Sequence, residues 1–65
     1  MTTIDKRLFP SAIIVLRSGR VRVEDWTGNN AFPNNMTFEN EEKAREAMTA
    51  WEEATTYEEL LAKIA

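Results

Sequence analysis

Hydrophobic and polar positions in the first half of the chain predict a β-hairpin. Residues 12–17 begin with an apolar, β-branched run, which is typical of a strand. Residues 20–26 then alternate, with Val21 and Val23 on one face and charged side chains on the other. The Ser-Gly pair between these runs favours a turn. We therefore expect two antiparallel strands joined by a tight connection.

The second half of the chain has the periodicity of two amphipathic helices. The first is expected to run from about Glu41 to Ala54, and Asn40 before it is a good N-cap residue. Thr56 then begins a capping box for the second helix. Both segments place apolar residues at intervals of three and four, so each helix has one face for a core. The two apolar stripes comprise Ala44, Ala47, Met48 and Trp51, and Tyr57, Leu60, Leu61 and Ile64.

The connection between the two halves leaves the number of strands open. Residues 27–35 are rich in Asn, Gly and Pro and predict a loop, whereas residues 36–39 are compatible with a short third strand. A lone hairpin is only marginally stable in water, so a third strand or a covering helix is needed. We expect an α+β fold, an antiparallel β-hairpin or three-stranded sheet followed by two α-helices, in a single compact domain spanning residues 1–65.

The first predicted strand offers large apolar side chains to both faces of the sheet, but two short helices can cover only one face. Either the N-terminal segment with Ile4, Leu8 and Phe9 covers the other face, or an apolar patch stays exposed for a partner. Dimerisation could also bury such a patch, although we expect a monomer.

The charges of the chain are divided unevenly along its length. The net charge is −3, but residues 39–65 carry eight acidic and three basic side chains, whereas residues 1–26 carry three acidic and five basic ones. This overall balance disfavours direct binding to nucleic acid. The absence of cysteine favours a reducing cytoplasm, and the longest apolar run is too short to cross a bilayer.

The composition also lacks the residues of most catalytic sites. There is no histidine, which is the side chain best suited to proton transfer near neutral pH and the commonest metal ligand. Without cysteine the usual zinc sites are excluded, and the two glycines are too few for a phosphate-binding loop. We therefore expect no enzymatic activity, no metal and no cofactor, and we look for a binding surface instead.

One face of the first predicted helix is acidic. At 100° per residue, Glu42, Glu46 and Glu53 fall opposite the apolar stripe and within about 40° of each other. We call these three residues the acidic ridge; Glu52 and Glu59 could extend its negative field. Such a row could imitate nucleic-acid phosphates and occupy the Lys/Arg groove of a nucleic-acid-binding protein. It could equally be a solvated face that keeps a small protein soluble.

Two other surfaces are candidates for binding. Trp26 and Phe32 flank the Asn-rich loop, where aromatic side chains could form a binding hot spot or fold inward to close the core. On the hairpin, Arg17, Arg20 and Arg22 could contact phosphates, lie in solvent or pair with the acidic half of the chain.

As a type, the chain resembles the phage-borne anti-CRISPR proteins. The resemblance rests on its small size, on the acidic stretch from Glu39-Asn40-Glu41-Glu42 to Trp51-Glu52-Glu53, and on the missing catalytic residues. It implies a non-catalytic inhibitor in the cytoplasm of a bacterial host cell, which covers the DNA-recognition surface of a Cas complex with its acidic ridge. The protein partner would be basic, and neither nucleic acid nor a membrane is expected to be bound directly. The alternative is a small phage or bacterial accessory or regulatory protein that binds a protein partner through an apolar aromatic loop or sheet face.

Overall fold

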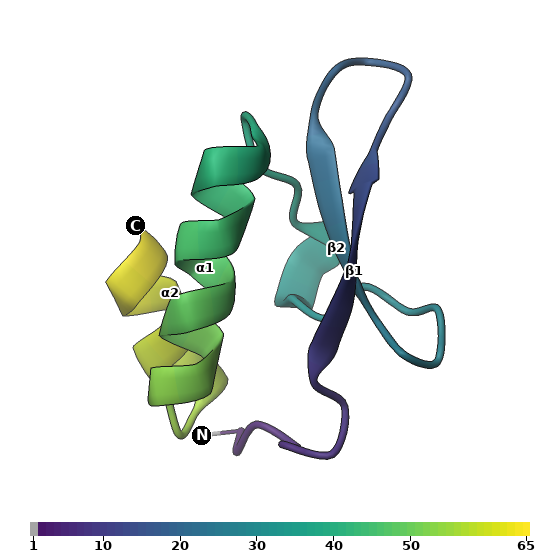
Figure 1. Ribbon diagram of the computed structural model, residues 1–65. Coiled ribbons are helices and arrows are strands. Elements are labelled where there is room, and N and C mark those ends of the chain that lie inside the picture. Colours follow the sequence, from purple (N-terminus) through teal and green to yellow (C-terminus); the bar gives the residue numbers. More distant parts are fainter. Residues whose placement is uncertain (1) are drawn as a thin grey trace.

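The computed structural model describes residues 2–65 and confirms the α+β arrangement of a hairpin followed by two helices (Figure 1). The helices lie on one side of the hairpin; α1 packs on both strands, and α2 packs against α1. The elements are β1 (Pro10–Val15), β2 (Val21–Asp25), a 3₁₀ turn (Pro33–Asn35), α1 (Glu41–Glu53) and α2 (Tyr57–Ile64).

The hairpin forms as its hydrophobic alternation predicts. Ile13 pairs with Val23 and Val15 with Val21, and both valines of β2 are buried under α1. Gly19 in the connecting turn has a φ of 92°, which is a conformation that favours glycine. The register shifts by one residue near the start of β1, where Ser11 forms a bulge.

The third strand that the sequence left open is reduced to a single paired residue. Phe38 donates its N–H to the Val21 carbonyl (2.7 Å), and Val21 donates its own N–H to the Phe38 carbonyl (2.8 Å). Further along β2, Ala31 donates to the carbonyl of Val23 (2.9 Å). The sheet of residues 2–65 therefore has two strands, and loop residues cover the far edge of β2.

Both helices begin at the residues expected to cap them. The side chain of Asn40 accepts a hydrogen bond from the Lys43 N–H (2.9 Å), and Thr56 Oγ1 accepts one from the Glu59 N–H (3.1 Å). The first predicted stripe faces the core, where Trp51 is buried with Ala44 and Ala47, while Met48 lies at its margin. Leu60 of the second stripe is fully buried beside them.

The N-terminal segment forms a strap across the junction of the two helices. Ile4 donates its N–H to the Thr55 carbonyl (2.9 Å), and Tyr57 donates to the Thr2 carbonyl (2.9 Å). The side chain of Ile4 is buried in the core on the helix side. The expectation that this segment covers the opposite sheet face is therefore wrong, because it packs where α1 ends and α2 begins.

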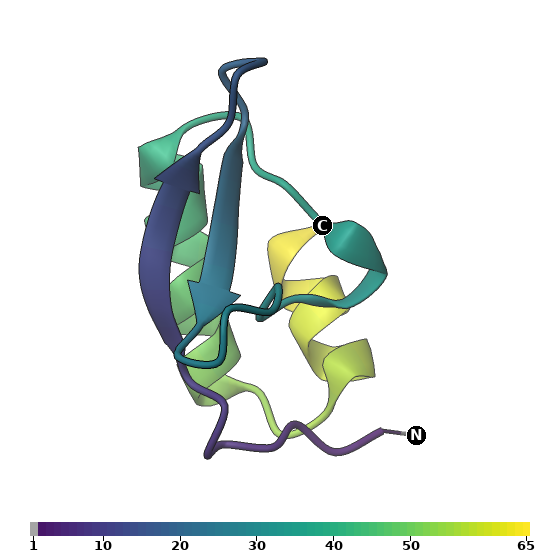
Figure 2. The same ribbon diagram turned by 90° about the vertical axis from the view of Figure 1, so that its right-hand side faces the viewer.

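The second sheet face is left without a covering helix. Figure 2 turns this face toward the viewer, and both helices lie behind the strands or to one side of them. It carries Ala12 and Ile14 of β1 opposite Glu24 and Arg22 of β2. Arg22 Nε lies 2.9 Å from Glu24 Oε2, a close ion pair without hydrogen-bond alignment. At one end of the sheet Phe9 is 51% exposed, so apolar surface does remain available.

Candidate partner-binding surface

The three glutamates of the acidic ridge lie together on the exposed side of α1. Glu42, Glu46 and Glu53 are all exposed, and α1 is helical without interruption from Glu41 to Glu53. Because Trp51 points into the core, the helical period turns the ridge away from it and into solvent. The geometric part of the sequence prediction is therefore confirmed.

The ridge is only loosely paired with cations of its own chain. Lys43 Nζ lies 3.9 Å from Glu46, and Lys63 Nζ lies 3.9 Å from Glu53. The two glutamate side chains remain 60% and 61% exposed, and such surface pairs contribute only about 0–1 kcal/mol. Within residues 2–65, Glu42 takes part in no ion pair. The ridge carboxylates can therefore exchange these lysines for cations of a partner at little cost.

The other two acidic candidates lie beside the ridge but not on it. Glu52 is exposed on the flank of α1, about 100° around the helix from Glu53, and its carbonyl accepts a hydrogen bond from Lys6 (3.2 Å). Glu59 belongs to the first turn of α2, where the helix dipole stabilises acidic side chains. The structure thus brings three of the five glutamates into one row.

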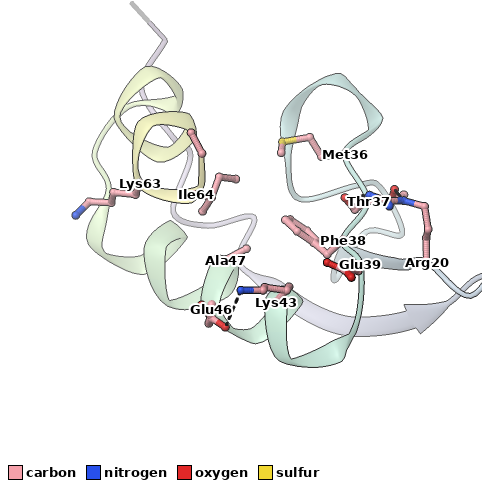
Figure 3. Close-up of a pocket in the computed structure, with 11 residues that line it drawn as sticks. Arg20, Met36, Thr37, Phe38, Glu39, Lys43, Glu46, Ala47, Lys63 and Ile64 are labelled. Atoms are coloured by element: carbon pink, nitrogen blue, oxygen red, sulfur yellow. Dashed lines mark hydrogen bonds and ion pairs between the residues drawn. The ribbon is translucent and has the colours of Figure 1, made fainter.

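A cleft of about 510 Å³ opens next to the ridge, between α1, the end of α2 and residues 36–39 (Figure 3). Figure 3 shows Met36 and Phe38 pointing into it from one side, with Ala47 and Ile64 on the opposite side. Glu46 lines the cleft and belongs to the ridge as well. This cleft could not be predicted from the sequence, because separate segments of the chain meet to form it.

Charged residues of both signs surround the apolar part of the cleft. The cationic ones are Arg20, Lys43 and Lys63, and the acidic ones are Glu39 and Glu46. Two of these residues, Lys43 and Glu46, form a loose ion pair with each other. The cleft therefore suits a partner segment that combines an apolar side chain with polar neighbours or charged neighbours of either sign.

Trp26 and Phe32 do not form one aromatic surface. Phe32 is only 3% exposed and packs edge-to-face on Phe38, with 5.1 Å between ring centroids. Trp26 is 61% exposed, and its indole N–H donates to the Arg7 carbonyl (2.7 Å). Of the two alternatives, Phe32 therefore folds inward and belongs to the core, whereas Trp26 stays exposed. The exposure of Trp26 could have been predicted from the alternation of β2, because Val21 and Val23 face inward and Trp26 falls on the other face.

The arginines of the hairpin are largely held by their own half of the chain. Arg20 donates to the Thr37 hydroxyl (2.6 Å) and to the Thr37 carbonyl (2.9 Å). Arg22 pairs with Glu24 on the same strand, while Arg17 is exposed near the turn. These contacts leave a weak basic surface, and the acidic ridge stays free of arginine.

Asp25 is a buried carboxylate that shapes the loop after β2. It is 6% exposed, and its Oδ1 accepts hydrogen bonds from the backbone N–H groups of Thr27 (2.8 Å) and Asn29 (3.2 Å). The hydroxyl hydrogen bond from Thr27, reinforced by these backbone donors, lowers the pKa of Asp25 below its ordinary value. A carboxylate held ionised in this way fixes a loop and is a poor proton donor.

Within residues 2–65 no three His, Cys, Asp or Glu side chains gather in a way that could hold a metal ion. Neither helix of that part of the chain combines the length and the apolar character needed to cross a membrane. No protein-family model, curated protein or solved structure matches the chain.

Proposed function

We propose that the chain is a non-catalytic inhibitor that binds a nucleic-acid-binding complex, in the manner of the anti-CRISPR proteins it resembles. Its acidic ridge occupies a basic DNA-recognition surface of a Cas complex in the cytoplasm of a bacterial host cell. The observation that carries the proposal is the row of three exposed carboxylates, Glu42, Glu46 and Glu53, held on one face of a rigid helix.

The spacing of the ridge fits a few basic side chains rather than a whole DNA duplex. Along the helix axis Glu42 and Glu46 are separated by about 6 Å, and Glu53 lies about 10 Å further. DNA carries one charge per about 1.7 Å of its axis, so the ridge replaces only a few phosphates. It therefore competes for selected Lys and Arg contacts, and the remaining affinity must come from neighbouring surface.

The cleft beside Glu46 can supply that neighbouring surface. A stable interface buries about 800 Å² on each partner. The whole molecule has a solvent-accessible surface of 4354 Å². An interface of that size takes about a fifth of the molecule and must extend beyond three glutamates. Met36 and Phe38 in the cleft offer apolar contacts directly next to the ridge.

The experiment compares two triple variants with the same change in charge. The ridge variant carries Glu42→Gln, Glu46→Gln and Glu53→Gln. The control variant carries Asp5→Asn, Glu24→Gln and Glu58→Gln, which lie on the N-terminal strap, on β2 and on α2. Tagged proteins are used to capture partners from bacterial lysate, and mass spectrometry identifies them. The affinity of the captured complex is then measured against salt concentration.

We expect the wild type and the control to capture a nucleic-acid-binding complex, and the ridge variant to lose it. Affinity for that complex should fall steeply as salt rises, because exposed charges are screened. A folded ridge variant that binds as tightly as the wild type would contradict the proposal.

The exposure of Trp26 favours a second candidate function, an accessory or regulatory protein that binds its partner through apolar contact. Its indole N–H is already satisfied by Arg7, so the ring can be buried by a partner without losing a hydrogen bond. In that case Trp26→Ala abolishes binding, the ridge variant binds normally, and salt has little effect.

A further inference from the structure

The backbone of β1 has an open edge. On β2, Val21 exchanges hydrogen bonds with Phe38, and the Val23 carbonyl accepts from Ala31, so both residues turn their backbone groups away from β1. Val15 and Ile13 lie directly opposite them in an antiparallel register. In an antiparallel pair of strands, two opposed residues either exchange backbone hydrogen bonds with each other or both turn their backbone groups to the outer sides of the pair. The N–H and C=O groups of Ile13 and Val15 therefore face the side of β1 that carries no strand.

This edge is accessible to another chain. Within residues 2–65 no hydrogen bond outside the β1–β2 ladder uses the backbone groups of Ile13 or Val15. Figure 1 looks onto the edge, with β1 in front of β2 and no other segment passing before it. The side chain of Val15 is 69% exposed, the largest exposure among the big apolar side chains of residues 2–65. Two backbone N–H donors and two C=O acceptors, from Ile13 and Val15, therefore lie beside the exposed side chain of Val15.

The regular part of β1 lacks the features that usually protect an edge strand. Edges are commonly blunted by lysine, proline, bulges or inward-pointing charges. Pro10 and the bulge at Ser11 occupy one end of β1, but residues 12–16 carry no charge and are mostly β-branched or large. Such an edge is a template for pairing with a further strand.

We propose that two copies of the chain pair through their β1 edges, antiparallel, about a two-fold axis at Ile14. In this register Ile13 of each copy lies opposite Val15 of the other, and four backbone hydrogen bonds form. The register is the one that uses both outward residues and avoids the bulge at Ser11. The result is a four-stranded sheet in the order β2–β1–β1–β2.

The proposed pairing is complementary in its side chains as well. On the face that carries the helices, Val15 packs beside Ile13 of the second copy, and on the other face Ile14 meets its own counterpart. Cross-strand apolar pairs of this kind stabilise sheets. No charged residue of one β1 meets a like charge of the other, because residues 10–16 are uncharged.

The two-fold axis stands perpendicular to the sheet, so both copies of α1 lie on the same face of the dimer. The two acidic ridges then belong to one continuous side of the assembly. This pairing differs from the monomer expected from the sequence, and it does not depend on the proposed function, because the edge and the ridge are separate surfaces.

Sedimentation equilibrium from micromolar to millimolar concentration tests the pairing. We expect a monomer–dimer equilibrium that added salt strengthens, because each copy carries a net charge of −3 and screening relieves their repulsion. Val15→Lys places a charge on the edge of both copies and should weaken dimerisation about tenfold or more. Ala62→Lys makes the same charge change on α2, away from the edge, and should leave the dimer intact.

Amide hydrogen exchange identifies the surface that pairs. The N–H groups of Ile13 and Val15 should become protected as concentration rises, while that of Ile14, which faces β2, is protected throughout. Val15→Pro deletes an outward donor without touching the β1–β2 ladder, and circular dichroism verifies its fold. It should abolish the dimer.

Three outcomes overturn the inference. One is a monomer at every concentration. Another is a dimer in which the amides of Ile13 and Val15 exchange freely. The third is a folded Val15→Pro variant that dimerises as the wild type does. Capture of a partner by the ridge bears on none of these results.

Discussion

The ammonium group of Lys6 lies 4.5 Å from the ring centroid of Trp51 and donates a hydrogen bond to the carbonyl of the same residue. It also donates to the Glu52 carbonyl (3.2 Å). The last turn of α1 contains no basic residue of its own. Lys6 therefore supplies, from the N-terminal strap, the cation that favours the negative end of a helix and the face of an indole ring.

Lys6→Met should destabilise the fold by about 1–2 kcal/mol. It removes both the favourable interaction of the cation with the helix dipole and the cation–π contact, but it keeps an apolar side chain. Urea denaturation at neutral pH measures the change. Lys43→Met is the matched control, because Lys43 makes one long exposed ion pair with Glu46 and should change stability by less than about 0.5 kcal/mol. Equal losses in the two variants would show that Lys6 acts only as a surface charge.

Asp25 should contribute to a loss of stability in acid. Its pKa is lowered in the folded chain from the ordinary 3.8, so the stability that it provides is present above that value. This stability is lost as the pH falls through the lowered pKa of the folded state. Asp25→Asn should therefore be less stable than the wild type near neutral pH, and the difference should shrink in strong acid.

Unfolding free energies measured across this pH range provide the test. Glu52→Gln, which removes one exposed carboxylate of α1, is the control. A constant gap between Asp25→Asn and the wild type would mean that ionisation of Asp25 does not stabilise the loop.

The two tryptophans should report opposite environments. Trp26 is 61% exposed and Trp51 is 3% exposed. In Trp26→Phe the remaining fluorescence comes from Trp51, so the emission should shift to shorter wavelength and acrylamide should quench it weakly. The wild type, with Trp26 included, should be quenched more strongly. If quenching is the same in both proteins, Trp26 is shielded and cannot serve as a contact surface.

Val23 and Val15 lie on neighbouring strands but in opposite environments. Val23 is fully buried, so Val23→Ala should cost about 2 kcal/mol through lost burial and a residual cavity. Val15→Ala removes the same atoms from an exposed site and should stay within about 0.5 kcal/mol at concentrations where the chain is monomeric. Thermal unfolding of both variants in dilute solution checks the difference. If both variants lost similar stability, the hairpin would not turn Val23 to the core and Val15 to solvent as described.

The sequence predicted the features that neighbouring residues determine. The caps at Asn40 and Thr56 satisfy helix N–H groups three residues away, and the position of Trp51 follows from the period of its own helix. The inward face of β2 follows from strict alternation. The row of ridge carboxylates could be predicted for the same reason, because one regular helix carries all three.

Features that depend on distant parts of the chain could not be predicted in this way. Ile4 was expected on the far sheet face, but its burial depends on how the junction of α1 and α2 closes over it. Phe38 pairs with Val21 at a single point because the loop before it curves through the turn at residues 33–35. The cleft and the open edge of β1 likewise arise only when separate segments meet.

The strap joins residues that are far apart in sequence, since Thr2 donates to the side chain of Glu58 across a separation of 56 positions. Ile4 lies before the hairpin and Leu60 lies in α2, yet both belong to the same core. The interior therefore cannot close until segments from either side of the hairpin and α1 have met. Closing so long a loop is entropically costly, so this step should limit the folding rate.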